Sequence, residues 1–216
     1  MQKLLCPSLM CADFGKLEEE VRALDRAGAD IFHCDIMDGV FVPNMAMGPL
    51  EVKAVRKATD KPVDVHLMIE NPGTKVDWFL DAGADIVYIH PESEKYCIKT
   101  LMHIKEKAAH PGIAINPDTP VSLVSELFPY CDYVMVMTVN PGFAGQKFIE
   151  TTKTKIRLLA EIKKDYDFIL MIDGACSPQV VREQYEAGVD GFVLGTSALF
   201  GKGRPYEEII KELHRE

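Results

Sequence analysis

Residues 168–174 read Phe-Ile-Leu-Met-Ile-Asp-Gly, which is five apolar side chains followed by a carboxylate and a glycine. A nearly continuous apolar run of this length is typical of a strand that is buried on both faces, as the strands of parallel sheets are. Seven further runs are predicted strands, at residues 4–8, 31–34, 63–68, 86–89, 113–115, 133–137 and 191–194. The chain therefore contains eight candidate strands.

The segments between these runs have the pattern of amphipathic helices. In residues 14–26, Leu17, Val21 and Leu24 form one apolar stripe, and residues 152–163 carry a similar one. A strand followed by a helix, eight times over, predicts an α/β fold with a parallel sheet. Eight such units close naturally into a (β/α)8 TIM barrel.

A short repeat supports this organisation. Ala-Gly-Ala-Asp or Ala-Gly-Val-Asp precedes three of the runs, at residues 27–30, 82–85 and 187–190. Its glycine suits the left-handed position that ends a helix. We expect a single barrel domain over residues 1–216. A doubly wound open sheet is the alternative, and it is disfavoured because no Gly-x-Gly-x-x-Gly follows the first run.

Composition excludes several classes of function. The 216 residues suit one α/β barrel. No basic run suggests nucleic-acid binding, and no apolar run approaches the roughly 20 residues of a membrane span. No segment has the pattern of a signal peptide. Six scattered cysteines without a Cys-x-x-Cys pair indicate reduced thiols. We therefore expect a cytoplasmic protein with neither a nucleic-acid nor a membrane partner.

Histidine and aspartate lie at the ends of three predicted strands. His33 and Asp35 belong to the second, His66 to the third and Asp173 to the seventh. Side chains two apart in a strand point the same way, and the carboxyl ends of barrel strands share the face that carries active sites. For one such pair, a buried histidine and a loop-capping aspartate would be the simpler interpretation. Four such residues at the strand ends of one barrel favour a metal site.

Two imidazoles and two carboxylates suit a divalent cation such as Zn²⁺, Mn²⁺, Fe²⁺, Co²⁺ or Mg²⁺, and they do not choose among these ions. Asp35 and Asp173 come from strands on roughly opposite sides of the barrel. As base and acid on two faces of a substrate they would invert a stereocentre, while the metal would polarise a carbonyl and hold an enediolate. Hydrolysis by a metal-activated water is the competing chemistry, and non-catalytic sugar-phosphate binding is a third hypothesis.

Methionines gather at the same predicted rim, at Met37, Met68 and Met137. Flexible apolar side chains often only fill a core. The alternative is an aprotic wall that excludes water and shields an enediolate from stray protonation. The sequence leaves these two interpretations open.

The loops after the last three predicted strands are rich in small residues. Barrel phosphate sites commonly use loops in this region, where backbone N–H groups can reach an anion. One such loop would be a weak signal, but three on adjacent strands predict a phosphate site. The residues concerned are Gly142, Phe143, Ala144, Gly145, Gly174, Ala175, Gly195, Thr196 and Ser197.

Together these segments resemble the ribulose-phosphate 3-epimerase family over essentially the whole chain. The matching residues are 7–9, 33–39, 41–44, 64–68, 139–143, 145–146 and 173–174. The resemblance implies one divalent metal on the four strand-end ligands, with Asp35 and Asp173 as the two acid/base groups. It implies that Ser8 and His66 contact a phosphorylated ketose and that the small-residue loops bind its phosphate. It also implies self-association, as a dimer or hexamer.

Several positions depart from the commonest pattern of that family, among them Thr138, Ala144, Ala175 and Thr196. These variants look like the branch that acts on D-allulose 6-phosphate. The resemblance therefore leads us to expect interconversion of D-allulose 6-phosphate and D-fructose 6-phosphate, by proton transfer at C3 through a metal-bound cis-enediolate. The alternative is conversion of D-ribulose 5-phosphate to D-xylulose 5-phosphate, in the pentose phosphate pathway.

Overall fold

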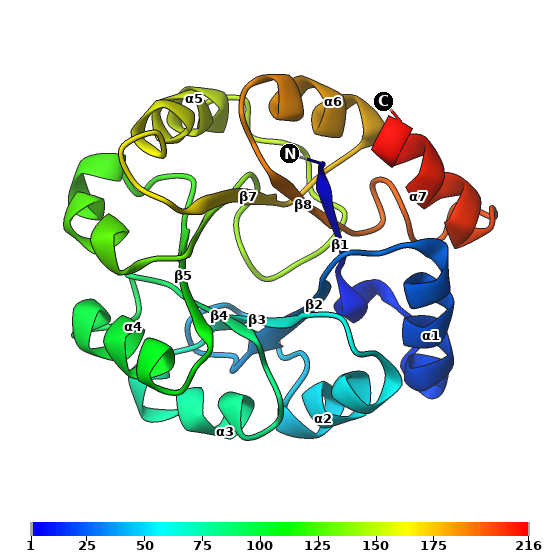
Figure 1. Ribbon diagram of the computed structural model, residues 1–216, viewed down its shortest axis with the longest axis horizontal. Coiled ribbons are helices and arrows are strands. Elements are labelled where there is room, and N and C mark those ends of the chain that lie inside the picture. The colour runs from blue at the N-terminus through cyan, green and yellow to red at the C-terminus, as the bar shows by residue number, and fades with distance from the viewer. Residues whose placement is uncertain (1, 216) are drawn as a thin grey trace.

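The computed structural model describes residues 2–215, in which eight parallel strands form a barrel inside a ring of helices (Figure 1). The strands are β1 (Leu4–Pro7), β2 (Phe32–Met37), β3 (Val63–Met68), β4 (Ile86–Ile89), β5 (His110–Ile115), β6 (Tyr133–Met137), β7 (Ile169–Asp173) and β8 (Gly191–Leu194). Every predicted run overlaps a strand, and four have the predicted bounds. The predicted TIM barrel is confirmed.

The α-helices are α1 (Leu17–Ala27), α2 (Pro49–Ala58), α3 (Val76–Leu80), α4 (Cys97–Glu106), α5 (Thr152–Ile162), α6 (Pro178–Glu186) and α7 (Tyr206–Arg215). The expectation of a helix in every connection is wrong between β5 and β6. There the chain forms 3₁₀ turns at Val121–Leu123 and Ser125–Tyr130. Pro129 lies inside the second turn, where it cannot donate the N–H that a continuous α-helix would need. Within residues 2–215, no helix is long and apolar enough to cross a bilayer.

The barrel closes less regularly at one seam than elsewhere. Parallel ladders join neighbouring strands from β1 through β8 and back down to β2. Between β1 and β2 there is instead an isolated bridge, which joins Ser8 to His33. Below it, Asp30 N–H donates a hydrogen bond to Leu5 O (3.0 Å). The seam therefore passes through two residues that the sequence predicts to be functional.

Alternate side chains of β2 and β3 point to opposite sides, as strand geometry requires. One set packs with the helices in the main apolar core and consists of Phe32, Cys34, Ile36, Val63, Val65 and Leu67. The other set points into the barrel. The same alternation makes a second apolar cluster inside the barrel, which includes Cys6, Tyr88, Ala114, Met135 and Met171.

The aspartates of the short repeat lie just before β2, β4 and β8, and their side chains bind the backbone of adjacent strands. Each accepts a hydrogen bond from a backbone N–H at the start of an adjacent strand. The pairs are Asp30 with Leu5 (2.9 Å), Asp85 with Val63 (2.8 Å) and Asp190 with Leu170 (2.8 Å). The repeat glycines are left-handed, with φ of +98° at Gly28 and +100° at Gly188, as predicted. The repeat thus organises the amino end of the barrel.

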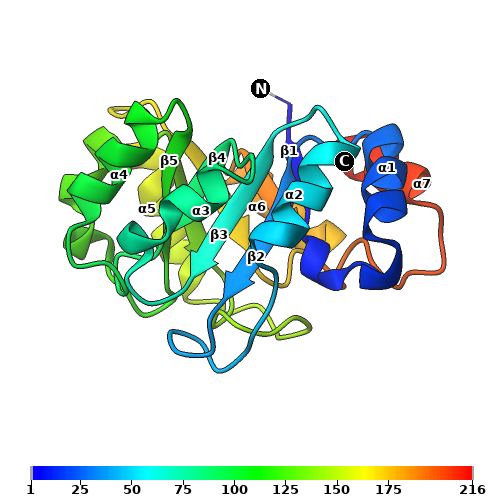
Figure 2. The same ribbon diagram turned by 90° about the horizontal axis from the view of Figure 1, so that it is seen from below.

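The opposite end carries the long loops. In Figure 2 the arrowheads of β2 and β3 point toward the side from which residues 38–48 and 138–151 project. These are the loops after β2 and β6. The carboxyl ends of the strands therefore share one face, and the loops above that face can enclose a site.

Candidate active site

The register between β2 and β3 arranges the polar side chains inside the barrel. Each residue of one strand lies beside a complementary residue of the other, because His-x-Asp in β2 is aligned with Asp-x-His in β3. The pairs are His33 with Asp64, Asp35 with His66, and Met37 with Met68. An imidazole therefore lies beside a carboxylate in two successive layers, and a methionine pair covers them.

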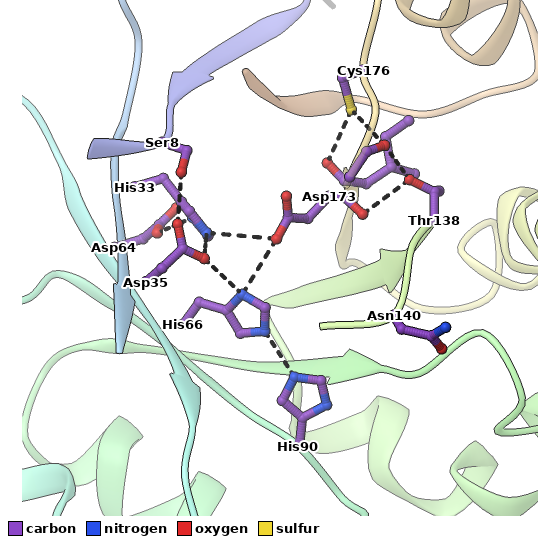
Figure 3. A network of polar contacts seen from close by, with 12 residues as sticks. Ser8, His33, Asp35, Asp64, His66, His90, Thr138, Asn140, Asp173 and Cys176 are labelled. Atoms are coloured by element: carbon purple, nitrogen blue, oxygen red, sulfur yellow. Dashed lines mark hydrogen bonds and ion pairs between the residues drawn. The ribbon is translucent and has the colours of Figure 1, made fainter. Parts of the chain in front are cut away.

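The four predicted metal ligands lie around one point (Figure 3), where one donor atom from each is within 4.8 Å of the others. His33 Nε2 lies 3.3 Å from Asp35 Oδ1 and 3.9 Å from Asp173 Oδ2. His66 Nδ1 lies 3.6 Å and 3.4 Å from the same two oxygens. The fold thus brings together the side chains that the sequence singled out from three separate strands.

These distances fit a divalent cation. Donor atoms on a tetrahedron with metal–ligand bonds of about 2.1 Å lie about 3.4 Å apart, and the four contacts span 3.3 to 3.9 Å. His33 Nε2 and His66 Nδ1 are buried, and neither has a hydrogen-bond partner in the part of the chain that the structure describes. A shared cation would give both nitrogens a partner.

The electrostatics of the cluster point the same way. Burial alone would lower the pKa of His33, but the carboxylates of Asp64 and Asp35 raise it well above its usual value. Burial likewise opposes the protonation of His66, whose pKa is nevertheless raised, chiefly by Asp173. Burial would raise the pKa of Asp35, yet His33 and His66 hold it well below its usual range. The raised histidine pKa values show that the carboxylates make the electrostatic potential at the cluster negative, and such a potential attracts a cation.

Each imidazole is also held from its other side. Asp64 Oδ1 lies 2.5 Å from His33 Nδ1, and His90 Nε2 lies 2.8 Å from His66 Nε2. Burial lowers the pKa of His90 to about 4, although Glu92 opposes the shift, so the ring is neutral at pH 7. The sequence alone assigned no role to Asp64 or His90. The mirrored His-x-Asp and Asp-x-His motifs are the signal that could have revealed the role of Asp64.

Two hydroxyl groups support the aspartates, one at a carboxylate and one at the backbone. Ser8 Oγ donates a hydrogen bond to Asp35 Oδ2 at 2.6 Å. Thr138 holds the chain at Asp173, whose carbonyl oxygen accepts from both the N–H (2.7 Å) and the hydroxyl (2.9 Å) of Thr138. The Thr138 hydroxyl also contacts the carbonyl oxygen of Gly174. Ser8 was predicted to contact a substrate, and here its hydroxyl orients a carboxylate.

A pocket opens above the carboxylates. It is lined by Ser8, Met10, Cys11, Asp35, Met37, Met68, Met137, Val139, Asn140, Pro141, Gly142, Phe143, Ala144, Gly145, Gln146, Asp173, Gly174, Ala175, Val193, Gly195, Thr196 and Ser197. All the predicted substrate-binding residues are on this wall except His66. His33 and His66 are fully buried, so Asp35 and Asp173 are the two predicted ligands that reach the pocket.

The pocket wall has an apolar side and a small-residue side. Met37 and Met68 pack with Val42 in a buried cluster below the loop after β2, while their side chains also reach the pocket. The core-filling and pocket-lining interpretations of these methionines therefore both apply. The small-residue loops form the other side, and no Lys or Arg in residues 2–215 lines the pocket. An anion here would rely on backbone N–H groups.

The loops after β2 and β6 meet above the pocket. Asn44 Nδ2 donates to Gly142 O at 2.7 Å. Gly142 is left-handed, with φ of +119°, and a Cβ there would lie 3.3 Å from Val42. Within the second loop, Gln146 Nε2 donates to the carbonyls of Asn140 (2.6 Å) and Phe143 (2.9 Å). These contacts hold the phosphate-binding candidates over the carboxylates.

Solved structures share the fold. The chain superposes on the tryptophan synthase α-subunit from Pyrococcus furiosus with a TM-score of 0.72 and 17% identity, over 99% of this chain and 98% of that one. It superposes on phosphoribosyl anthranilate isomerase from Thermus thermophilus with a TM-score of 0.68 and 13% identity, over 100% and 97%. At these identities the likeness concerns the barrel alone.

Sequence relatives are much closer. The pattern of the Ribulose-phosphate 3 epimerase family matches residues 4–200. The chain is 42% identical to the ribulose-phosphate 3-epimerase of Bacillus subtilis (strain 168), over 92% of each chain. It is 38% identical to the enzyme of the same name from Escherichia coli (strain K12), over 100% of this chain and 96% of that one. It is 42% identical to the chloroplastic ribulose-5-phosphate-3-epimerase of Arabidopsis thaliana, over 96% and 75%. This chain is therefore a carbohydrate-phosphate epimerase and belongs to the ribulose-phosphate 3-epimerase family.

Proposed function

We propose that this protein is a metal-dependent 3-epimerase that acts on D-ribulose 5-phosphate and forms D-xylulose 5-phosphate. The observation that carries the proposal is the placement of Asp35 and Asp173. Each carboxylate contacts the buried imidazole pair and also lines the pocket. A substrate in this pocket would meet two proton-transfer groups from different strands.

His33, Asp35, His66 and Asp173 would hold one divalent cation. Bound there, the cation supplies Lewis-acid chemistry, which polarises the ketose carbonyl and makes the C3 proton more acidic. The donor set of nitrogen and oxygen atoms suits several divalent ions, and it does not select one.

The aspartates would divide the proton transfer between them. Asp35 is assigned as the initial base, because Ser8 and the imidazoles keep it ionised and therefore able to accept a proton. It takes the C3 proton on one face, and the electron pair left behind delocalises into an enediolate. Asp173, as the neutral acid, then gives a proton to C3 from the other face. The configuration at C3 is inverted, and each carboxyl group ends in the other's initial state. The reverse reaction or proton exchange with solvent resets them.

The remaining pocket residues would bind and protect the substrate. The backbone of residues 142–145, 174–175 and 195–197 would hold the phosphate, since no cationic side chain within residues 2–215 lines this wall. Met37, Met68 and Met137 would keep water away from the enediolate, because thioethers neither donate nor accept protons readily.

The choice of substrate departs from our expectation based on sequence variants. That expectation was D-allulose 6-phosphate, and the relatives that match this chain do not support it. Those from Bacillus subtilis, Escherichia coli and Arabidopsis thaliana are all named for ribulose phosphate. Their names match the alternative substrate better, and we adopt it here.

One comparison of rates tests the proposal. The protein, loaded with a divalent metal, is assayed with D-ribulose 5-phosphate and with D-allulose 6-phosphate, and kcat/KM is measured for each. We expect a clear preference for the pentulose phosphate, loss of activity on chelation and its return when metal is added back. Preference for the hexulose phosphate would contradict the substrate but leave the mechanism. Activity that survives complete metal removal would contradict the metal dependence.

Self-association as a dimer or hexamer and a cytoplasmic location stay predictions. Measurement of the mass in solution tests the first. Fractionation of the source cells tests the second.

A further inference from the structure

A chain of hydrogen bonds runs away from the metal site behind His66. His66 Nδ1 faces the carboxylates of Asp35 and Asp173, and its Nε2 lies 2.8 Å from His90 Nε2 (Figure 3). Both rings are fully buried and stacked, with centroids 5.0 Å apart. Two nitrogens at this distance share one proton, so one ring donates and the other accepts.

Glu92 determines which of the two rings, His66 or His90, donates the hydrogen bond between them. Its Oε2 lies 3.3 Å from His90 Nδ1, and an ionised carboxylate can only accept. The proton of a neutral His90 therefore belongs on Nδ1, which leaves Nε2 as an acceptor. His66 must then carry a proton on Nε2, so Nδ1, which faces the carboxylates, is the nitrogen left to bind a metal. This is the form of histidine that binds a metal.

Glu92 is itself fixed by the next connection. Its Oε1 accepts from the backbone N–H of Asn116 (2.9 Å) and contacts the hydroxyl of Thr119. Burial would raise the pKa of Glu92, but His90, Thr119 and Asn116 lower it to about 2. The relay thus begins at a carboxylate held by the β5 loop, passes through His90 after β4 and ends at a metal ligand on β3.

We propose that Glu92 and His90 are positioning residues, which hold His66 in the tautomer that leaves Nδ1 free for the metal. The inference rests on the proposed metal site and extends it. It differs from the support of the other imidazole, where Asp64 contacts His33 directly at 2.5 Å. Partners behind a metal-binding histidine fix its orientation and basicity, and their loss typically weakens metal binding about 10- to 100-fold.

The test uses Co²⁺ as the probe. Its affinity for the metal-free protein is measured by visible absorbance with a competing chelator, and ¹⁵N NMR of the protein loaded with diamagnetic Zn²⁺ reports whether Nε2 of His66 carries the proton. We expect His90→Phe to weaken Co²⁺ binding about 10- to 100-fold and to release the fixed Nε2–H tautomer. His90→Gln keeps an acceptor oxygen, so its affinity should lie closer to that of the wild type. His103→Gln, on the exposed side of α4, is the matched control and should change neither readout.

Glu92→Gln provides a second, independent variant. It keeps the shape of the side chain but removes the charge, so Co²⁺ binding should weaken less than in His90→Phe. This variant and the NMR tautomer decide the question if His90→Phe does not fold. Wild-type affinity in both variants, with His66 still protonated on Nε2, would overturn the relay and leave the proposed function intact. A wild-type protein that binds no Co²⁺ would overturn the metal site and the relay together.

Discussion

Aspartates lie at both ends of this barrel, and the two groups have different partners. At the amino end, Asp85 pairs with Arg56 and Asp190 pairs with Lys163, each at 2.7 Å. Both also accept a backbone hydrogen bond from a neighbouring strand. Their charge and their acceptor capacity are therefore used within the fold.

At the carboxyl end, Asp35 and Asp173 have no Lys or Arg partner among residues 2–215. Their partners are buried imidazoles and, for Asp35, the Ser8 hydroxyl, and both carboxylates line the pocket. Both carboxylates therefore remain able to bind a cation and to contact a substrate. Aspartate therefore serves stability where the fold pairs its charge with Lys or Arg, and it serves chemistry where the fold leaves that charge without such a partner. Substitutions at the two ends of the barrel separate these roles.

The largest effect is expected at the carboxyl end. Asp173→Asn keeps the size of the side chain but cannot exchange a proton, so kcat for epimerisation should fall about 10²- to 10⁴-fold while the protein stays folded. The same holds for Asp35→Asn. Turnover and exchange of the C3 proton with D₂O are measured beside a thermal melt. Near-normal turnover in either variant would remove that carboxylate from the mechanism.

At the amino end, we expect a smaller effect, which lowers stability and leaves turnover unchanged. Asp190→Ala leaves the Leu170 N–H without its acceptor and Lys163 without its partner. The free energy of unfolding, measured in urea, should fall by about 2 kcal/mol, while kcat per folded molecule stays the same. Asp190→Asn retains an oxygen acceptor and should lose less stability. A large fall in kcat for Asp190→Ala would show that the two ends are not separate in function.

The smallest effect concerns pH. Burial would raise the pKa of Asp132, but hydrogen bonds from Lys105 and His110 hold it below its usual value. A lowered carboxyl pKa stabilises the fold above the unfolded-state value of about 3.9, and this contribution is lost as pH falls through the folded-state pKa. Because Lys105 is exposed, the contribution should be at most about 1 kcal/mol. Asp132→Asn should therefore be slightly less stable than the wild type at pH 7. The gap should narrow as pH falls below the unfolded-state value and close below the folded-state pKa. A gap that widens in acid would reverse the assigned sign.

Local sequence predicted most of the fold. The strands were found because strands buried on both faces are continuous apolar runs, and Val63–Met68 shows the pattern fully. The connection after β5 was mispredicted as a helix. Its apolar spacing is compatible with a helix, but Pro129 interrupts it because proline cannot donate the N–H that a continuous α-helix would need.

The candidate site was predicted less completely. His33, Asp35, His66 and Asp173 could be found because each lies at a strand end, and barrel topology gathers strand ends on one face. The contact of Asp64 with His33 depends on the stagger between two strands, which no single run encodes. The contacts of His90 with His66 and of Asn44 with Gly142 join segments far apart in the chain.

The sequence by itself determined which residues alternate into the barrel and at which end the polar ones lie, because strand periodicity and chain direction are local properties. Only the tertiary structure decided what lies behind each imidazole, which ligands reach the pocket and where the barrel closes with a single bridge. Those outcomes depend on register between strands and on loop contacts. They are set by the packing of the whole barrel, and each hydrogen bond in them joins residues that are distant in sequence.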